Sequence, residues 1–185
     1  MRRLLLITGD IAAGKSVFAE ILSKRYQIVA LCKDCLKEVL GDTIGFSNRL
    51  ENKKLSTATV ELMVFVFSEF SKLGKDLILE ANFHEKELEK FHQIALESNY
   101  EVLTLVLRGD VAILHERYLN RMNHENRHPV HLSTNIDIFE NFKKCTDYMR
   151  TEKVHGNTIT VNANDFSYQN DADLLCKIDN FISEH

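Results

Sequence analysis

The chain has 185 residues, 44% of them apolar, and one proline, a composition typical of a single folded domain over residues 1–185. The 23 Lys and Arg residues against 27 Asp and Glu residues give a formal net charge of −4, which argues against a nucleic-acid partner. No apolar run approaches the roughly 20 residues of a membrane span. The four cysteines are expected to be free thiols in a cytoplasmic protein.

The first half of the chain alternates short apolar runs with segments of helical apolar spacing. The short runs predict strands at residues 4–8, 28–31 and 77–80. The helical spacing predicts helices over 14–25, over 33–40 with a stop at Gly41, and from Ser56 or Thr57 to Leu73 with a stop at Gly74. Residues 42–55 lack a clear period, and we expect a loop there.

The second half continues this alternation. Strands are predicted at residues 102–107 and 159–161. Helices are predicted over 85–98, after a cap at Asp110, along the stripe 138–149 and over 174–182, with a polar stretch at 124–134. Strands that alternate with helices build βαβ units, so we expect an α/β protein with three α/β/α layers around a five-stranded parallel sheet.

A phosphate-binding loop is predicted between the first strand and the first helix, at Gly9-Asp10-Ile11-Ala12-Ala13-Gly14-Lys15-Ser16. Its glycines let the backbone turn N–H groups toward a phosphate, at the positive end of the following helix. In this motif the lysine reaches the β- and γ-phosphates of a nucleotide, and the hydroxyl of the last residue, here Ser16, binds Mg²⁺. The sequence therefore predicts binding of ATP with Mg²⁺.

With this loop, the chain resembles the small P-loop kinases, the group that contains polynucleotide 5′-kinase, zeta-toxin-like and chloramphenicol-phosphotransferase-like proteins, over residues 3–149. The resemblance implies a P-loop NTPase fold with strand order 2-3-1-4-5 and a helical lid at about residues 115–135. It also implies that the loop after the fifth strand, Val161-Asn162-Ala163-Asn164, passes the adenine ring and contacts it mainly through the backbone.

The resemblance assigns roles to polar residues that follow two of the strands. It implies that Asp34 faces the acceptor hydroxyl, where a carboxylate can take the proton as a base. Lys37 stands where an arginine is usual, and a lysine lacks the planar fork for bidentate contact with an anion. Glu80 resembles an acid that binds Mg²⁺ through water or orients Lys37, and Asn82 is expected to contact substrate. Helix capping by Asp34 and a plain polar strand end at Glu80 are the alternatives.

A basic segment follows the fourth strand. Arg117 and Arg121 are four residues apart on one helix face, and Arg127 follows in a polar loop. The resemblance implies that Arg121 and Arg127, together with Lys15, stabilise charge on the transferring phosphoryl group, while Arg117 anchors the lid. A solvated helix face is the alternative.

A group of three histidines and a pair of cysteines are not predicted to bind a metal. His124, His128 and His131 do not have the spacing of a tetrahedral set, and hydrogen bonding or substrate contact is favoured for them. Cys32 and Cys35 form a C-x-x-C, but a closed zinc site needs four ligands and the chain has no second pair, which favours accidental spacing.

Together these features predict an ATP-dependent phosphotransferase that moves the γ-phosphoryl group to a hydroxyl of a small-molecule acceptor. Two alternatives stay open. One is a nucleotide-binding switch without transfer activity, and the other is a nucleotide-sugar kinase of the zeta-toxin type. No motif in the sequence identifies the acceptor.

Overall fold

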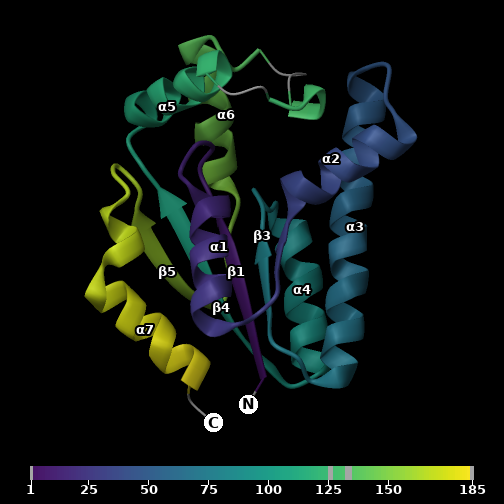
Figure 1. Cartoon of the computed structure of the whole chain (residues 1–185), viewed down its shortest axis with the longest axis vertical. Helices are drawn as coiled ribbons and strands as arrows, with labels where there is room; N and C mark the ends of the chain where they lie inside the picture. The colour runs from purple at the N-terminus through teal and green to yellow at the C-terminus, as the bar shows by residue number, and fades with distance from the viewer. Residues whose placement is uncertain (1, 125–126, 132–134, 184–185) are drawn as a thin grey trace.

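The computed structural model describes residues 2–124, 127–131 and 135–183. Five parallel strands form one sheet in the order β2-β3-β1-β4-β5, which confirms the predicted fold class (Figure 1). The strands are β1 (Arg2–Gly9), β2 (Ala30–Cys32), β3 (Leu77–Glu80), β4 (Tyr100–Arg108) and β5 (Asn157–Asn162). The helices are α1 (Lys15–Tyr26), α2 (Lys33–Ile44), α3 (Arg49–Leu73), α4 (Glu85–Glu97), α5 (Val111–His124), η1 (Pro129–His131), α6 (Phe139–Thr151), η2 (Ser167–Asn170) and α7 (Ala172–Ser183).

The central strand β1 is buried on both faces. Leu5 and Ile7 pack with side chains of α1, α5, α6 and α7, whereas Leu4 and Leu6 pack with side chains of α3 and α4. All four leucine and isoleucine side chains are at most 1% exposed. Successive strand residues point to opposite faces, so a continuous apolar run is what a strand between two helical layers requires.

The carboxyl ends of the strands meet at one edge of the sheet. Ile7 of β1 pairs with Glu80 of β3, and Gly9 pairs with Leu107 of β4. The segment that carries α5, η1 and α6 lies over this edge at the top of Figure 1. Ligands of open α/β sheets bind at this edge, and the fold therefore directs the search for a site there.

The predicted loop at 42–55 is wrong. Helix α2 continues to Ile44, and α3 begins at Arg49, seven residues before the predicted start. The missed signal is a cap: the Asn48 side chain accepts from the Glu51 N–H at 3.0 Å, which satisfies one of the first free N–H groups of the helix. The Glu51 carboxylate also accepts, at 2.6 Å, from the N–H of Ser47, which precedes the cap residue.

The predicted helix stop at Gly41 is also wrong, because the helix ends at Gly45. The Gly45 N–H donates to the Gly41 carbonyl at 2.9 Å, and Gly45 takes a positive φ of 77°. A Cβ at Gly41 would lie 3.4 Å from both His128 and Val130, which pack against this point of the helix. Gly41 therefore lies inside the helix, facing a neighbouring segment, and does not end the helix.

Gly9 permits the transition from strand β1 to the phosphate loop. Its φ is +124°, and a Cβ there would lie 2.1 Å from the Leu107 carbonyl oxygen. The same carbonyl accepts the Asp10 N–H at 2.8 Å, so the two backbones cannot separate without losing that hydrogen bond. The loop thus starts from a point fixed by close backbone contact with β4.

We expect Gly9→Ala to destabilise the fold by more than Gly45→Ala. Both positions have positive φ, which costs a non-glycine residue about 1–3 kcal/mol, but Gly45 has no atom within 4 Å of a built Cβ. The matched pair therefore isolates the clash with Leu107. Chemical denaturation measures the two free energies of unfolding, and equal losses would contradict this account of Gly9.

Candidate functional site

A cavity of about 760 Å³ opens at the carboxyl edge of the sheet. It lies between the phosphate loop, the start of α2, the end of β3 and the segment that begins with α5. Its lining residues are Ile11, Ala12, Ala13, Gly14, Lys15, Ser16, Val17, Lys33, Asp34, Ser56, Glu80, Ala81, Asn82, His84, Arg117, Tyr118, Asn120, Arg121, Arg127, Met149 and Phe166. The cavity therefore unites segments from Ile11 to Phe166 of the chain.

The phosphate loop is shaped by three residues with positive φ, Gly9 at +124°, Ala12 at +61° and Gly14 at +85°. A Cβ at Gly14 would lie 2.6 Å from the Tyr168 hydroxyl oxygen. That hydroxyl is buried and donates to the Ala13 carbonyl at 2.9 Å, so the segment after β5 supports the loop from behind. The result is a preformed loop at the N-terminus of α1, where an anion is stabilised by the helix dipole.

Lys15 lies at the centre of this loop and is 7% exposed. Its Nζ donates to the carbonyl oxygens of Asp10 at 2.7 Å and Gly9 at 3.3 Å. Burial lowers the pKa of Lys15, while the carboxylates of Glu80 and Asp34 act in the opposite direction. The lysine is thus held at the cavity wall by main-chain oxygens.

Ser16 and Glu80 form a pair of oxygen ligands at the cavity floor. The Ser16 hydroxyl donates to the Glu80 carboxylate at 3.0 Å, and Glu80 is 4% exposed. A hydroxyl and a carboxylate are oxygen ligands of the kind that Mg²⁺ prefers, so the residues present fit this ion. The thiol of Cys32 lies 3.9 Å from the Ser16 oxygen. Burial of this thiol and the nearby charge of Glu80 raise the pKa of Cys32.

The acceptor side of the cavity contains Asp34 and Asn82, but not Lys37. Asp34 lies in the first turn of α2 and Asn82 just after β3, and both line the cavity. Lys37, one turn further along α2, directs its Nζ toward the Val130 carbonyl at 3.4 Å, and burial lowers its pKa. The structure therefore brings together all the residues predicted for the acceptor side except Lys37.

The basic segment reaches the cavity through three arginines. We call residues 111–151, from α5 to α6, the lid segment. Arg117, Arg121 and Arg127 of this segment line the cavity. The Arg127 guanidinium lies 5.7 Å from the centre of the Tyr118 ring and 3.7 Å from the Met122 sulfur. Tyr118 and Met122 thus contact Arg127 from within the same segment, while burial and, to a lesser extent, the charge of Arg121 lower the pKa of Lys15.

The tip of the lid segment is docked on α2 and α3. The Val130 carbonyl accepts a buried hydrogen bond from the Asn52 side chain at 2.8 Å. His128 contacts the Asp42 carboxylate at 2.9 Å, and His131 contacts that of Glu38 at 2.8 Å. Both histidines therefore hydrogen-bond to acids of α2. The side chain of His124 lies outside the described residues.

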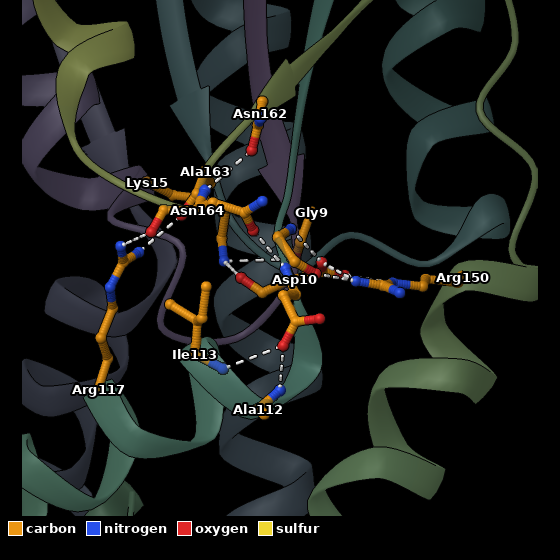
Figure 2. A network of polar contacts seen from close by, with 12 residues as sticks. Gly9, Asp10, Lys15, Ala112, Ile113, Arg117, Arg150, Asn162, Ala163 and Asn164 are labelled. Carbon is orange, nitrogen blue, oxygen red and sulfur yellow. Dashed lines mark hydrogen bonds and ion pairs between the residues drawn. The ribbon is translucent and has the colours of Figure 1, made fainter.

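The segment after β5 lines the cavity at a residue that lies outside the predicted stretch. Val161 is buried in the core, and the Asn162 side chain accepts the Asn164 N–H at 3.0 Å, so neither lines the cavity. Arg117 instead donates to the carbonyls of Ala163 and Asn164, as Figure 2 shows, and lies 4.3 Å from the Phe166 ring. Phe166, which sequence reasoning missed, lines the cavity.

Gly9 and Asp10, the first two residues of the motif, do not line the cavity. The Asp10 carboxylate turns away from it and pairs with Arg150 at 2.6 Å (Figure 2). Sequence reasoning missed Arg150, because nothing near it in the chain links the end of one helix to a loop 140 residues earlier. The other predicted residues of the loop, from Ile11 to Ser16, line the cavity.

Within the described residues, no three or more His, Cys, Asp or Glu side chains are grouped so that they could hold a metal ion. The four cysteines are all unbridged. In the same part of the chain, no helix has the length and hydropathy that crossing a bilayer requires. Cys32 and Cys35 lie at the N-cap and in the first turn of α2, respectively.

Comparison with known proteins gives one family match. The zeta toxin family model matches residues 2–173 of the chain. No curated protein gives a significant match to the sequence.

Solved structures share the fold over nearly the whole chain. A candidate kinase from Chloroflexus aurantiacus superposes with a TM-score of 0.84 at 21% identity, over 99% of both chains. A gluconokinase from Sinorhizobium meliloti gives 0.57 at 12% identity, over 100% of this chain and 98% of that one. A shikimate kinase from Bacteroides thetaiotaomicron gives 0.55 at 13% identity, over 97% of each. At these identities the likeness establishes the fold.

Proposed function

Because the chain belongs to the zeta toxin family of P-loop kinases, we propose that it transfers the γ-phosphoryl group of ATP to a hydroxyl of a small-molecule acceptor. The observation that carries the proposal is the shared cavity: the phosphate loop, Asp34 and the lid arginines all line it. A transferring group must be reached from three sides, by the loop that holds it, by the acceptor and by cations that offset its charge.

The nucleotide phosphates bind the loop at Ile11–Ser16. Backbone N–H groups at the start of α1 favour negative charge, and Lys15 moves from the carbonyls of Gly9 and Asp10 to the β- and γ-phosphates. Ser16 and Glu80 hold Mg²⁺, which supplies charge that offsets the phosphate oxygens. The adenine ring of the nucleotide lies beside Phe166 and the loop at Ala163–Asn164. Arg117 fixes this loop in place.

The acceptor hydroxyl approaches from the side of α2. Asp34 orients this hydroxyl and takes its proton as the oxygen attacks the γ-phosphorus. The bond between the γ-phosphorus and the β,γ-bridging oxygen breaks at the same time, so ADP leaves, while Asn82 contributes a hydrogen bond to the acceptor. Arg121 and Arg127 face the equatorial oxygens, where charge spreads in the transition state. Lys37 has no contact with the acceptor in this proposal, because its Nζ is directed toward Val130.

A nucleotide-sugar acceptor, as in kinases of the zeta-toxin type, is the second candidate and is favoured by the family match. The decisive assay incubates the protein with γ-labelled ATP and Mg²⁺ against a panel of sugars, sugar acids, alcohol metabolites and nucleotide sugars. Hydrolysis is measured in parallel. Label in an acceptor supports the kinase and identifies the acceptor class, whereas ATP binding with no transfer to any of them would favour a nucleotide-dependent switch.

We expect Lys15→Ala to weaken ATP binding and abolish turnover, because the β- and γ-phosphates lose their charged partner. Lys24→Ala is the matched control, since Lys24 lies on the same helix and pairs with Glu20 on the surface. Calorimetric titration with ATP and the transfer assay check both variants. Wild-type binding and turnover in Lys15→Ala would remove the loop from the proposal.

Asp34→Asn keeps the shape of the side chain but removes its basicity. Transfer should fall about a hundredfold or more, the usual contribution of a general base, while ATP affinity stays near the wild-type value. Single-turnover kinetics with saturating ATP provides the measurement. If transfer were unchanged, Asp34 would be an acidic residue in the first turn of α2 with no part in the chemistry.

For Arg127→Ala we expect kcat to fall about a hundredfold or more, because the guanidinium acts on charge that develops in the transition state. ATP affinity should change less than about tenfold, which corresponds to 1.4 kcal/mol. Arg121→Ala should behave alike, and Arg49→Ala, at an exposed arginine at the start of α3, is the control. Loss of affinity with kcat preserved would instead make these arginines ground-state phosphate ligands.

A further inference from the structure

The second residue of the phosphate loop carries a buried charge that the proposed chemistry does not use. Asp10 is 3% exposed, and its side chain does not line the cavity. Its backbone, by contrast, is part of the loop: the N–H donates to the Leu107 carbonyl at 2.8 Å, and the carbonyl accepts from Lys15 at 2.7 Å. A buried carboxylate is unfavourable unless it is paired, so its partners carry information about its role.

The partners of the Asp10 carboxylate are Arg150 and Gly109. Arg150 donates from Nε to Oδ1 at 3.2 Å and from Nη2 to Oδ2 at 2.6 Å, and the Gly109 N–H donates to Oδ2 at 3.0 Å. Arg150 Nη2 also donates to the Gly109 carbonyl at 2.5 Å. The hydrogen bond to Asp10 raises the pKa of Arg150. The three residues form a closed set of charge-assisted hydrogen bonds.

These partners stand at the two ends of the lid segment. Gly109 comes two residues before α5, and Arg150 lies in the last turn of α6. Everything the lid segment brings to the cavity, including Arg121 and Arg127, lies between them in the chain. One carboxylate therefore holds both ends of the lid segment, while the carbonyl of the same residue holds Lys15.

We propose that Asp10 and Arg150 are positioning residues that join the lid segment to the phosphate loop, so that nucleotide binding and the placement of the lid arginines are coupled. The inference rests on the proposed kinase function for its kinetic consequences. Neither residue touches the reacting atoms. Asp10 acts through the loop backbone and Lys15, and Arg150 acts through the course of α6.

The charge of Arg150 has a separate effect from its geometry. With Arg150 present, the Asp10 carboxylate is neutralised beneath the loop. Without it, an unpaired negative charge would lie in a poorly solvated place next to the site for the ATP phosphates and repel them. A lysine at this position would restore the charge, but not the planar fork that serves Asp10 and Gly109 together.

The experiment compares Arg150→Ala, Arg150→Lys and the double variant Asp10→Asn with Arg150→Ala. Arg150→Ala should raise the Kd for ATP about tenfold or more and lower kcat about tenfold or more, because charge and position are both lost. The double variant should return the Kd to within about threefold of wild type, since no unpaired charge is left, while kcat stays low. Arg150→Lys should likewise keep the Kd and lose kcat.

Lys143→Ala is the control, because it removes an exposed cation from the same helix, where Lys143 pairs with Asp147. It should change neither parameter. A double variant that folds but binds ATP as weakly as Arg150→Ala would overturn the charge argument. A wild-type kcat in Arg150→Lys would overturn the argument that the planar guanidinium of Arg150 positions the lid segment.

Hydrogen exchange of the ligand-free protein provides a readout that does not depend on kinase activity. In Arg150→Ala, the exchange rate should rise together in peptides covering residues 9–16 and 109–114, because the contacts of Arg150 with Asp10 and Gly109 link these two segments. The exchange rate should stay unchanged in α7. Uniform acceleration over the whole chain would make Arg150 a general stabilising residue and overturn the proposal. If the wild-type protein bound no ATP, the proposed function would be wrong. The exchange experiment would still test whether Asp10 and Arg150 join the lid segment to the phosphate loop.

Discussion

The register of the three central strands is the constraint on which the site depends. Pairing of Ile7 with Glu80 and of Gly9 with Leu107 sets the height at which β1, β3 and β4 end. A slip of β3 by one residue would exchange the two faces of the strand and put Leu79 opposite Ser16 in place of the carboxylate. The apolar runs that bury these strands thus also align the oxygen ligands.

Three charged side chains in the phosphate loop and at the end of β3 are buried. Lys15, Asp10 and Glu80 are each less than 10% exposed, and each has a specific partner: main-chain carbonyls for Lys15, Arg150 for Asp10 and Ser16 for Glu80. Burial of such groups is tolerated only when hydrogen bonds replace water. The same bonds fix the loop before any ligand arrives, and fixed dipoles need no reorganisation when charge moves.

Sequence patterns predicted what is local, and the family resemblance is confirmed by the match over residues 2–173. The five strands and the phosphate loop follow from apolar runs and one motif, which need no knowledge of distant contacts. The failures lie where distant contacts decide: Gly41 lies within a helix against His128 and Val130, and Lys37 is directed toward Val130. The residues next to Arg150 and Phe166 in the sequence do not indicate which distant segments these two side chains contact.

The attachments of the lid segment differ in strength from one end to the other. At the tip, the histidine partners Asp42 and Glu38 are 75% and 42% exposed, and such pairs contribute at most about 1 kcal/mol each. At the base, the Asp10 side chain is buried and the Arg150 side chain is 28% exposed, so loss of one partner costs up to about 3–5 kcal/mol, the range for fully buried pairs. The ion pair at the base is therefore the strongest ionic attachment of the segment, whereas the tip depends mainly on the buried hydrogen bond from the Asn52 side chain to the Val130 carbonyl.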